Sequence, residues 1–299
     1  MLKNYLKKAV LATTLCYMYA CTTNSPSNKE LPSESSTEVS SNNKGKLFII
    51  GGGPRPVSLI KRLVDASGIR NGGYVVILPM ASADPADTVL FYSRRQFDSL
   101  GIKNIVAFSF KKGEKPAPSK IDSLSKATII YISGGDQNKF MDIVGGTEIE
   151  KAILTAYQNG ATIAGTSAGA AVMSEKMITG NALKYPDYES TFEVIEAKNL
   201  DIGRGLGFIK RGIIDQHFLI RSRHNRLITS IIEYPDLIGV GIDESTAILV
   251  QGDSAEVVGL SQVMVFENPE RSAYQKNGKL GARNLRIHLL VEGEKFFLR

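Results

Sequence analysis

A serine stands between two glycines in the sequence GTSAGA at residues 165–170. The preceding residues, ATIAG, have the composition of a buried strand, and the following AAVMSEKM has that of a helix. Glycines beside a serine at such a junction allow the tight strand–turn–helix geometry of a nucleophile elbow. Ser167 is therefore the candidate nucleophile. The first N–H groups of the helix that follows it are candidate donors to an oxyanion.

A serine hydroxyl needs a base to take its proton, and the chain contains three histidines. His224 lies among arginines, whose charges oppose an imidazolium, and His288 lies in a strand-like tail. His217 follows an apolar, strand-like run. Because α/β sheets place their sites at the carboxyl ends of parallel strands, His217 is the favoured base.

The base needs a carboxylate to orient it, and two arrangements remain open on the residues alone. Asp243 and Glu244 follow another apolar run in the sequence GVGIDEST. Ser167, Asp243 and His288 have the chain order of α/β-hydrolase esterases, which predicts a lipase-like enzyme. The other possible triad has the chain order Ser167, His217, Glu244.

Strand and helix signals alternate from Lys46 onward. Continuous apolar runs such as KLFII, YVVILPMAS and TIIYIS are separated by segments with helical spacing. This alternation predicts one doubly wound α/β domain, residues 46 to about 266, with a mostly parallel sheet and helices on both faces. Two further strands are expected to pair around a turn at Gly252-Asp253, and the C-terminal tail is expected to form an edge strand.

The N-terminal 20 residues differ from the rest. The 299-residue chain is 43% hydrophobic and 22% charged, which is ordinary for a globular protein. Residues 1–20 carry three lysines and then an apolar run that is too short to span a bilayer, which predicts a secretory signal. Cys21 follows in YMYAC, which resembles the lipobox of bacterial lipoproteins. We therefore expect an exported protein, periplasmic or at the cell surface, held by a lipid on Cys21.

Export also bounds the chemistry of the mature chain. Removal of residues 1–20 lowers the formal net charge from +6 to +3, and we expect no nucleic-acid partner. Residues 21–45 are rich in Ser, Thr, Asn and Pro, so they are expected to be a disordered tether to a domain at residues 46–299. Of the two cysteines, Cys16 would leave with the signal and Cys21 would be acylated, which excludes a cysteine hydrolase and a thiolate metal site.

Five motifs in order carry a family resemblance. SGGDQ, GTSAGAAVM, GLGFI, DQHFLIRSRHNRL and GIDESTA together resemble cyanophycinase and its relatives in serine peptidase family S51, which include aspartyl dipeptidases. The resemblance runs from about Lys46 to the C-terminus. It implies a class I glutamine amidotransferase-like fold and a triad of Ser167, His217 and Glu244, and it outweighs the esterase order, which rests on one pentapeptide.

The same resemblance implies the residues that position the substrate. In cyanophycinase such residues hold the β-aspartyl-arginine unit of a polymer, and in this chain they are Gln137, Asp215, Arg221, Arg223 and Arg226. Arginines grip carboxylates in bidentate fashion. Asp215 is expected to pair with the guanidinium of the substrate. Gln137 can donate and accept, as alignment of a peptide group requires.

The implied reaction is hydrolysis of a β-aspartyl amide bond through an acyl-enzyme, most directly cyanophycin to β-Asp-Arg, with no metal or organic cofactor. The N–H groups of Ala168 and of Gly134-Gly135 are the expected oxyanion donors. Two alternatives are an exported aspartyl or isoaspartyl dipeptidase and a peptide-binding lipoprotein that cleaves nothing. A homodimer is implied by the resemblance alone. Residues 181–204 are longer and more acidic than expected for the family, and should border the cleft.

Overall fold

The computed structural model describes residues 45–187 and 192–298. The chain divides into Met1–Val39 and Ser40–Arg299, and the fold described below belongs to the second unit. The predicted signal, Cys21 and the tether up to residue 44 lie outside the described residues. Within the described ranges, no helix is long and apolar enough to cross a membrane.

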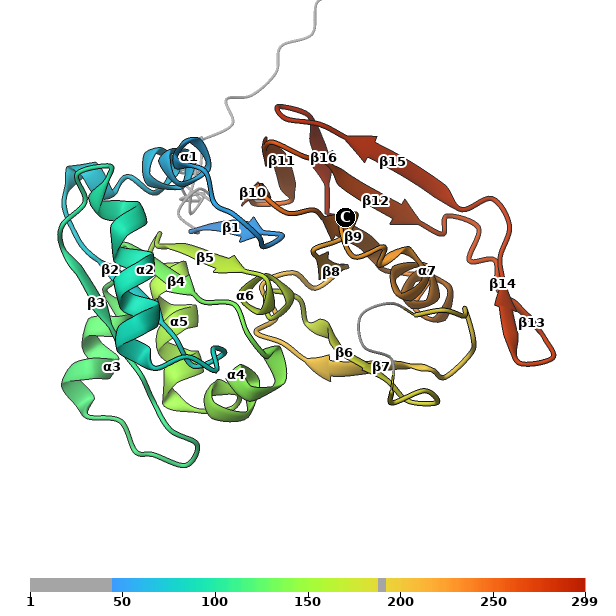
Figure 1. Cartoon of the computed structure of the whole chain (residues 1–299), viewed down its shortest axis with the longest axis horizontal. Coiled ribbons are helices and arrows are strands. Elements are labelled where there is room, and N and C mark those ends of the chain that lie inside the picture. The colour runs from blue at the N-terminus through green and yellow to red at the C-terminus, as the bar shows by residue number, and fades with distance from the viewer. Residues whose placement is uncertain (1–44, 188–191, 299) are drawn as a thin grey trace, which may run out of the picture. The chain divides into compact units, whose positions relative to one another are not determined.

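An eight-stranded sheet forms the centre of the domain, in the order β16-β11-β10-β1-β5-β4-β2-β3 (Figure 1). Its five parallel strands are β1 (Lys46–Ile50), β5 (Thr162–Thr166), β4 (Ile129–Ile132), β2 (Val75–Leu78) and β3 (Ile105–Ala107). The antiparallel strands are β10 (Thr246–Gln251), β11 (Ser254–Gly259) and β16 (Lys295–Phe297). The parallel strands are buried apolar runs, as two covered faces require.

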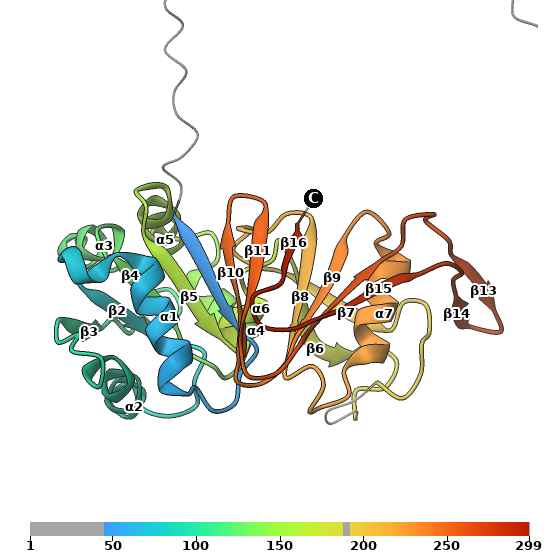
Figure 2. The same ribbon diagram turned by 90° about the horizontal axis from the view of Figure 1, so that it is seen from above.

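Helices cover both faces of this sheet (Figure 2). Phe48 and Ile50 pack with α1 (Val57–Ser67) and α2 (Ala86–Asp98), and Leu47 and Ile49 face the opposite core. The helices of that core are α3 (Pro118–Ser125), α4 (Gln137–Val144), α5 (Glu148–Gln158) and α6 (Ala168–Ala171). A short 3-10 helix at Ile69–Asn71 follows α1. Alternation along each strand thus divides its side chains between two cores.

A second sheet has the order β15-β12-β9-β8 and packs on α7 (His224–Glu233). Its strands are β8 (Gly212–Gln216), β9 (Ile238–Ile242), β12 (Val263–Glu267) and β15 (Arg286–Leu290), and β8 is parallel to β9. Two small antiparallel pairs complete the fold: β6 (Lys176–Ala182) with β7 (Leu200–Arg204), and β13 (Tyr274–Lys276) with β14 (Lys279–Gly281).

The predicted doubly wound, mostly parallel α/β fold is confirmed, and so is the hairpin that turns at Gly252 between β10 and β11. The tail supplies two edge strands instead of one: β15 borders the second sheet and β16 borders the first. The sequence did not reveal that β8 and β9 belong to a separate sheet. Buried parallel strands have the same apolar composition whichever sheet they join.

Candidate active site

Ser167 occupies a strained turn between β5 and α6. Its backbone has φ 53° and ψ −111°, which residues other than glycine rarely adopt. A Cβ on Gly165 would lie 2.0 Å from the carbonyl oxygen of Gly169, and one on Gly169 would lie 2.4 Å from that of Ile132. The two glycines that flank the serine are therefore required by the close approach of α6 to the sheet, as the sequence predicted.

Three side chains that are distant in the sequence form one hydrogen-bonded relay. The Oγ of Ser167 lies 2.8 Å from Nε2 of His217, and Nδ1 of His217 lies 2.5 Å from Oε1 of Glu244. An ionised carboxylate only accepts, so Nδ1–H of the neutral imidazole donates to Glu244 and Nε2 accepts from the serine hydroxyl. This is the geometry in which a histidine serves as general base for a serine nucleophile.

The relay joins the two sheets. Ser167 follows β5 of the first sheet, whereas His217 follows β8 and Glu244 lies two residues after β9 of the second. The carbonyl of Ile50, the last residue of β1, accepts from the N–H of Ser167 at 3.0 Å, and the carbonyl of Gly51 accepts from that of His217 at 2.7 Å. The end of β1 therefore holds the nucleophile and the base side by side.

The glycines after β1 make room for the relay. A Cβ on Gly52 would lie 2.4 Å from the imidazole ring of His217, and one on Gly53 would lie 2.3 Å from Oε2 of Glu244. Gly52 and Gly53 also have positive φ values of 112° and 66°. Side chains at these two positions would collide with the base and its acid, so the run of glycines after the first strand serves the site directly.

The esterase-like order of Ser167, Asp243 and His288 is wrong for this chain. Oδ1 of Asp243 accepts from the backbone N–H groups of Leu219 and Ile220, each at 3.0 Å, and its Oδ2 accepts from the hydroxyl of Ser261 at 2.7 Å. Asp243 thus holds the turn that follows the base.

The other two histidines are elsewhere. His288 lies on edge strand β15, opposite Val265, and its Nε2 is 3.6 Å from Glu267. His224 begins α7, and its ring lies 4.9 Å from that of Phe218. Of the three candidate bases in the sequence, His217 alone meets Ser167.

The environment of His217 keeps its imidazole neutral. Burial is the main cause that lowers its pKa below the ordinary 6.5; Arg221 and Arg223 lower it further, and the hydrogen bond to Glu244 opposes them. A neutral imidazole at physiological pH is ready to accept the proton of Ser167. The same shift gives stability a pH dependence: below pH 6.5 the unfolded chain binds a proton that the folded one does not, so stability falls as pH decreases.

We expect kcat/KM to fall as the medium is acidified, with the midpoint of the acidic limb below 6.5, because only the neutral imidazole can act as base. Arg221→Gln removes one of the cations that lower this pKa, so its midpoint should move upward. The measurement is a pH–rate profile of both forms. A midpoint above 6.5 in the unmodified enzyme would contradict the assignment.

Two N–H groups beside the nucleophile suit an oxyanion. Ala168 is the first residue of α6, and a Cβ on Gly134 would lie 3.3 Å from Cβ of Ser167, so the Gly134-Gly135 loop runs alongside the nucleophile. Within the described residues, the N–H groups of Ala168 and Gly135 donate to no backbone carbonyl. Their role as oxyanion donors stays a prediction that this arrangement permits.

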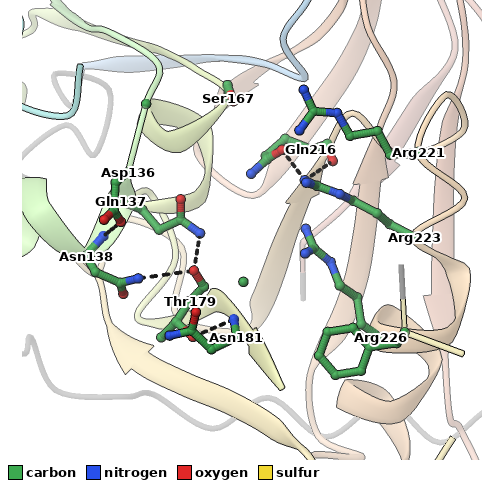
Figure 3. A pocket seen from close by; sticks show the side chains of 13 residues that line it. Asp136, Gln137, Asn138, Ser167, Thr179, Asn181, Gln216, Arg221, Arg223 and Arg226 are labelled. Atoms are coloured by element: carbon green, nitrogen blue, oxygen red, sulfur yellow. Dashed lines mark hydrogen bonds between the residues drawn. The ribbon is translucent and has the colours of Figure 1, made fainter. Parts of the chain in front are cut away.

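A cavity of about 280 Å³ opens in front of Ser167 (Figure 3). Its lining residues are Gly135, Asp136, Gln137, Asn138, Ser167, Thr179, Gly180, Asn181, Phe192, Gln216, Arg221, Arg223 and Arg226. Nε2 of Gln137 donates to the carbonyls of Ile178 at 3.1 Å and Thr179 at 2.6 Å. Asn181 and Phe192 come from residues 181–204, so the prediction that this segment borders the cleft is confirmed.

Arg221, Arg223 and Arg226 form the cationic wall of the cavity, across from Gln137 and Thr179 (Figure 3). Nε of Arg226 donates to Oδ2 of Asp215 at 2.7 Å, and its Nη2 donates to Oδ1. Asp215 is only 1% exposed. Its carboxylate is therefore occupied, and the expected pairing of Asp215 with a substrate guanidinium does not fit this geometry. Asp215 positions Arg226 instead.

Arg223 is buried like Arg226, but its positive charge is less well balanced by Asp215. Its Nη1 donates to the carbonyl of Gln216 at 2.8 Å and to the Oε1 of the same residue, but lies 3.8 Å from Asp215. Burial, above all, and the neighbouring Arg226 lower the pKa of Arg223 to about 10. Arg223 still carries its charge at neutral pH, while Arg221 is exposed at the same wall. This wall can receive an anionic group.

Sequence reasoning missed several residues of the site. The glycines at residues 51–53, which leave room for His217 and Glu244, were not among the residues predicted to serve the site. Gln216 stands inside the DQHF motif, next to the base, yet its contact with Arg223 was not foreseen. Thr179 and Asn138 gave no signal, because polar residues of their kind occur throughout loops.

Comparison with known proteins identifies the family. The profile of peptidase family S51 matches residues 47–258 of this chain. The chain belongs to peptidase family S51. Cyanophycinases of Nostoc sp. and Trichormus variabilis are each 30% identical to it over 266 residues, covering 85% of this chain and 86% of theirs. This S51 peptidase is accordingly a serine hydrolase.

Solved structures share the fold. A peptidase from an acI-B1 Actinobacterium aligns with this S51 peptidase at a TM-score of 0.61 and 24% identity, covering 85% of this chain and 97% of that one. A putative peptidase E protein from Listeria monocytogenes aligns at 0.52 and 18% identity, covering 73% and 100% respectively.

Proposed function

We propose that this S51 peptidase hydrolyses aspartyl amide bonds in a polymer of β-aspartyl-arginine units, cyanophycin, and releases β-Asp-Arg dipeptides. The observation that carries the proposal is the relay of Ser167, His217 and Glu244, which opens onto a cavity with a cationic wall. The similarity to cyanophycinases over 85% of the chain supports the substrate class.

The geometry supports an acyl-enzyme mechanism. His217, held by Glu244, takes the proton of Ser167 as the serine oxygen attacks the carbonyl carbon of the amide. The oxyanion accepts hydrogen bonds from the N–H groups of Ala168 and Gly135. His217 then gives its proton to the leaving amine, and the C–N bond breaks. Water, activated by the same imidazole, hydrolyses the ester and restores the serine hydroxyl.

The cationic wall suits a substrate that presents free carboxylates. In each β-aspartyl-arginine unit both carboxyl groups of the aspartate are in amide bonds, so the free carboxylate is the α-carboxylate of the arginine. The planar guanidinium of an enzyme arginine matches a carboxylate with two parallel hydrogen bonds. Arg226 is occupied by Asp215. Arg223 and Arg221 line the cavity beside it and are the proposed carboxylate receptors, and Gln137 on the opposite wall aligns the peptide group.

Product analysis tests the proposal. The purified enzyme is incubated with cyanophycin and with a panel of α- and β-aspartyl dipeptides, and the products are measured by mass spectrometry. We expect β-Asp-Arg from the polymer. Faster cleavage of isoaspartyl dipeptides than of polymer would favour the dipeptidase alternative. If a fluorophosphonate labels Ser167 but none of these compounds is cleaved, both the cyanophycin proposal and the dipeptidase alternative are contradicted.

Export and lipidation at Cys21 are a separate proposal, based on the charged-then-apolar N-terminus and the YMYAC sequence. We expect the full-length protein to partition into the detergent phase of a Triton X-114 extract and Cys21→Ala to move to the aqueous phase. Cys16→Ala, which changes the other cysteine, is the matched control and should behave as the unmodified protein. Retention of Cys21→Ala in the detergent phase would contradict the anchor. We also propose a homodimer, on the family resemblance alone. Light scattering on the Cys21→Ala protein from the aqueous phase measures its mass, and we expect the mass of two chains.

A further inference from the structure

Three buried hydroxyl groups behind the nucleophile have no hydrogen bond of good geometry. Among the described residues, the buried side-chain atoms that lack one are Tyr131 OH, Ser133 Oγ, Thr162 Oγ1, Thr166 Oγ1, Asn199 Nδ2 and Arg223 Nε. Tyr131, Ser133 and Thr166 are 2%, 5% and 4% exposed. Buried polar groups are nearly always hydrogen-bonded, so a group of such hydroxyls indicates a partner that the protein itself does not supply.

The three hydroxyls lie on one face of two neighbouring strands. Tyr131 lies in β4, Ser133 directly follows that strand, and Thr166 ends β5, which pairs with β4 in parallel. The register places Ile132 opposite Gly165, so Ser133 is level with Thr166. Tyr131 packs in the core with α1 and α2, and alternation puts Ser133 and Thr166 on the same side. Burial raises the pKa of the Tyr131 hydroxyl, while the charge of Arg55 and hydrogen bonding with the neighbouring Thr166 hydroxyl oppose that shift, so the hydroxyls of Tyr131 and Thr166 lie close together.

Thr166 and Ser133 are direct chain neighbours of the site residues. Thr166 directly precedes Ser167, and Ser133 directly precedes the Gly134-Gly135 loop that runs alongside the nucleophile. None of the three hydroxyl residues lines the cavity in front of Ser167. They therefore lie behind the elbow, and two of them directly precede the nucleophile and the proposed oxyanion loop in the chain.

We propose that Tyr131, Ser133 and Thr166 bind an internal water molecule that positions the nucleophile elbow. A buried water typically makes about three hydrogen bonds to polar groups that otherwise lack partners, which is the number of hydroxyls present. Such a water links the end of β4 to the end of β5. It fixes the distance between Ser167 and the Gly134-Gly135 loop, and it supports the strained backbone of Ser167, which neighbouring structure must hold in place. The three are positioning residues, because none touches the substrate.

A crystal structure at about 1.5 Å resolution tests the site itself. We expect an ordered water within hydrogen-bonding distance of at least two of the three hydroxyls. Direct hydroxyl–hydroxyl bonds that satisfy all three, with no water among them, would overturn the proposal.

Variants test the positioning role. Tyr131→Phe and Thr166→Val each remove one hydroxyl with little change in shape. We expect kcat to fall roughly tenfold with KM within about twofold, since small displacements of a nucleophile are costly while substrate contacts stay intact. Thr162→Val is the matched control: Thr162 is a buried, unpartnered threonine on the same face of β5, at its other end, and its loss should leave kcat unchanged. If Thr166→Val does not fold, Tyr131→Phe still provides the test.

The inference rests on the proposed function only through Ser167 as nucleophile, so the rate of fluorophosphonate labelling provides a readout that needs no peptide substrate. Slower labelling of Tyr131→Phe than of Thr162→Val, at equal melting temperatures, supports the water site even if cyanophycin is not cleaved. Equal labelling rates of Tyr131→Phe, Thr162→Val and the unmodified enzyme would overturn it, whatever the substrate is.

Discussion

Replacement of Ser167 by alanine is expected to reduce turnover of the aspartyl substrate by roughly 10⁴-fold or more, because it removes the atom that forms the acyl-enzyme. Among the described residues, the hydrogen-bond partner of this hydroxyl is His217, so we expect its loss to leave the elbow and the cavity in place. Substrate binding should therefore persist while release of product stops. Single-turnover kinetics and isothermal titration with the uncleaved substrate measure the two quantities.

A matched control separates loss of the nucleophile from loss of a serine. Ser58 lies exposed on α1, and Ser58→Ala should retain full activity and full fluorophosphonate labelling. Turnover by Ser167→Ala within tenfold of the unmodified enzyme would show that another group performs the attack, and the relay would then need a different interpretation.

Asp215→Ala is expected to destabilise the fold by about 3–5 kcal/mol, the usual cost of removing one partner of a buried ion pair. Asp215 and Arg226 are 1% and 4% exposed, and Arg223 is 8% exposed beside them. Without the carboxylate, two buried guanidinium groups would face each other uncompensated. The cavity wall should distort as well, so KM for an acidic substrate should rise.

Urea unfolding followed by circular dichroism measures this change in the free energy of unfolding. Asp236→Ala is the control, because Asp236 pairs with Arg271 at 2.6 Å in an exposed ion pair, and exposed pairs contribute little. A loss below about 1 kcal/mol for Asp215→Ala would show that water already reaches this pair in solution.

The nucleophile and much of the fold could be predicted from the sequence because their causes are local. The glycines around Ser167 reflect contacts within the same strand–turn–helix unit, and these appear in the sequence as spacing. Apolar runs that alternate with helical segments similarly indicate a covered parallel sheet. The position of His217 after a strand-like run favoured it as the base, but the choice between the two triad orders, and so of Glu244 over Asp243, came from motif resemblance.

The remaining parts of the site depend on contacts between distant segments. Whether Asp215 faces the substrate or an arginine depends on the position of α7 relative to β8, which no local pattern encodes. The same is true of Asp243, whose carboxylate resembles that of a catalytic acid in the sequence but holds a backbone turn in the structure. Assignment of β8 and β9 to a second sheet is likewise a matter of tertiary pairing.

The division of the relay between two sheets has a consequence for thermal inactivation. His217 and Glu244 follow β8 and β9, whereas Ser167 follows β5. A parting of the sheets that breaks the backbone bond from His217 to Gly51 therefore also breaks the Ser167–His217 bond, while the strands of each sheet stay paired. On heating, activity should therefore be lost at a temperature several degrees below that at which the circular dichroism signal is lost. Cooling from that interval should restore activity at once, because neither sheet has to refold.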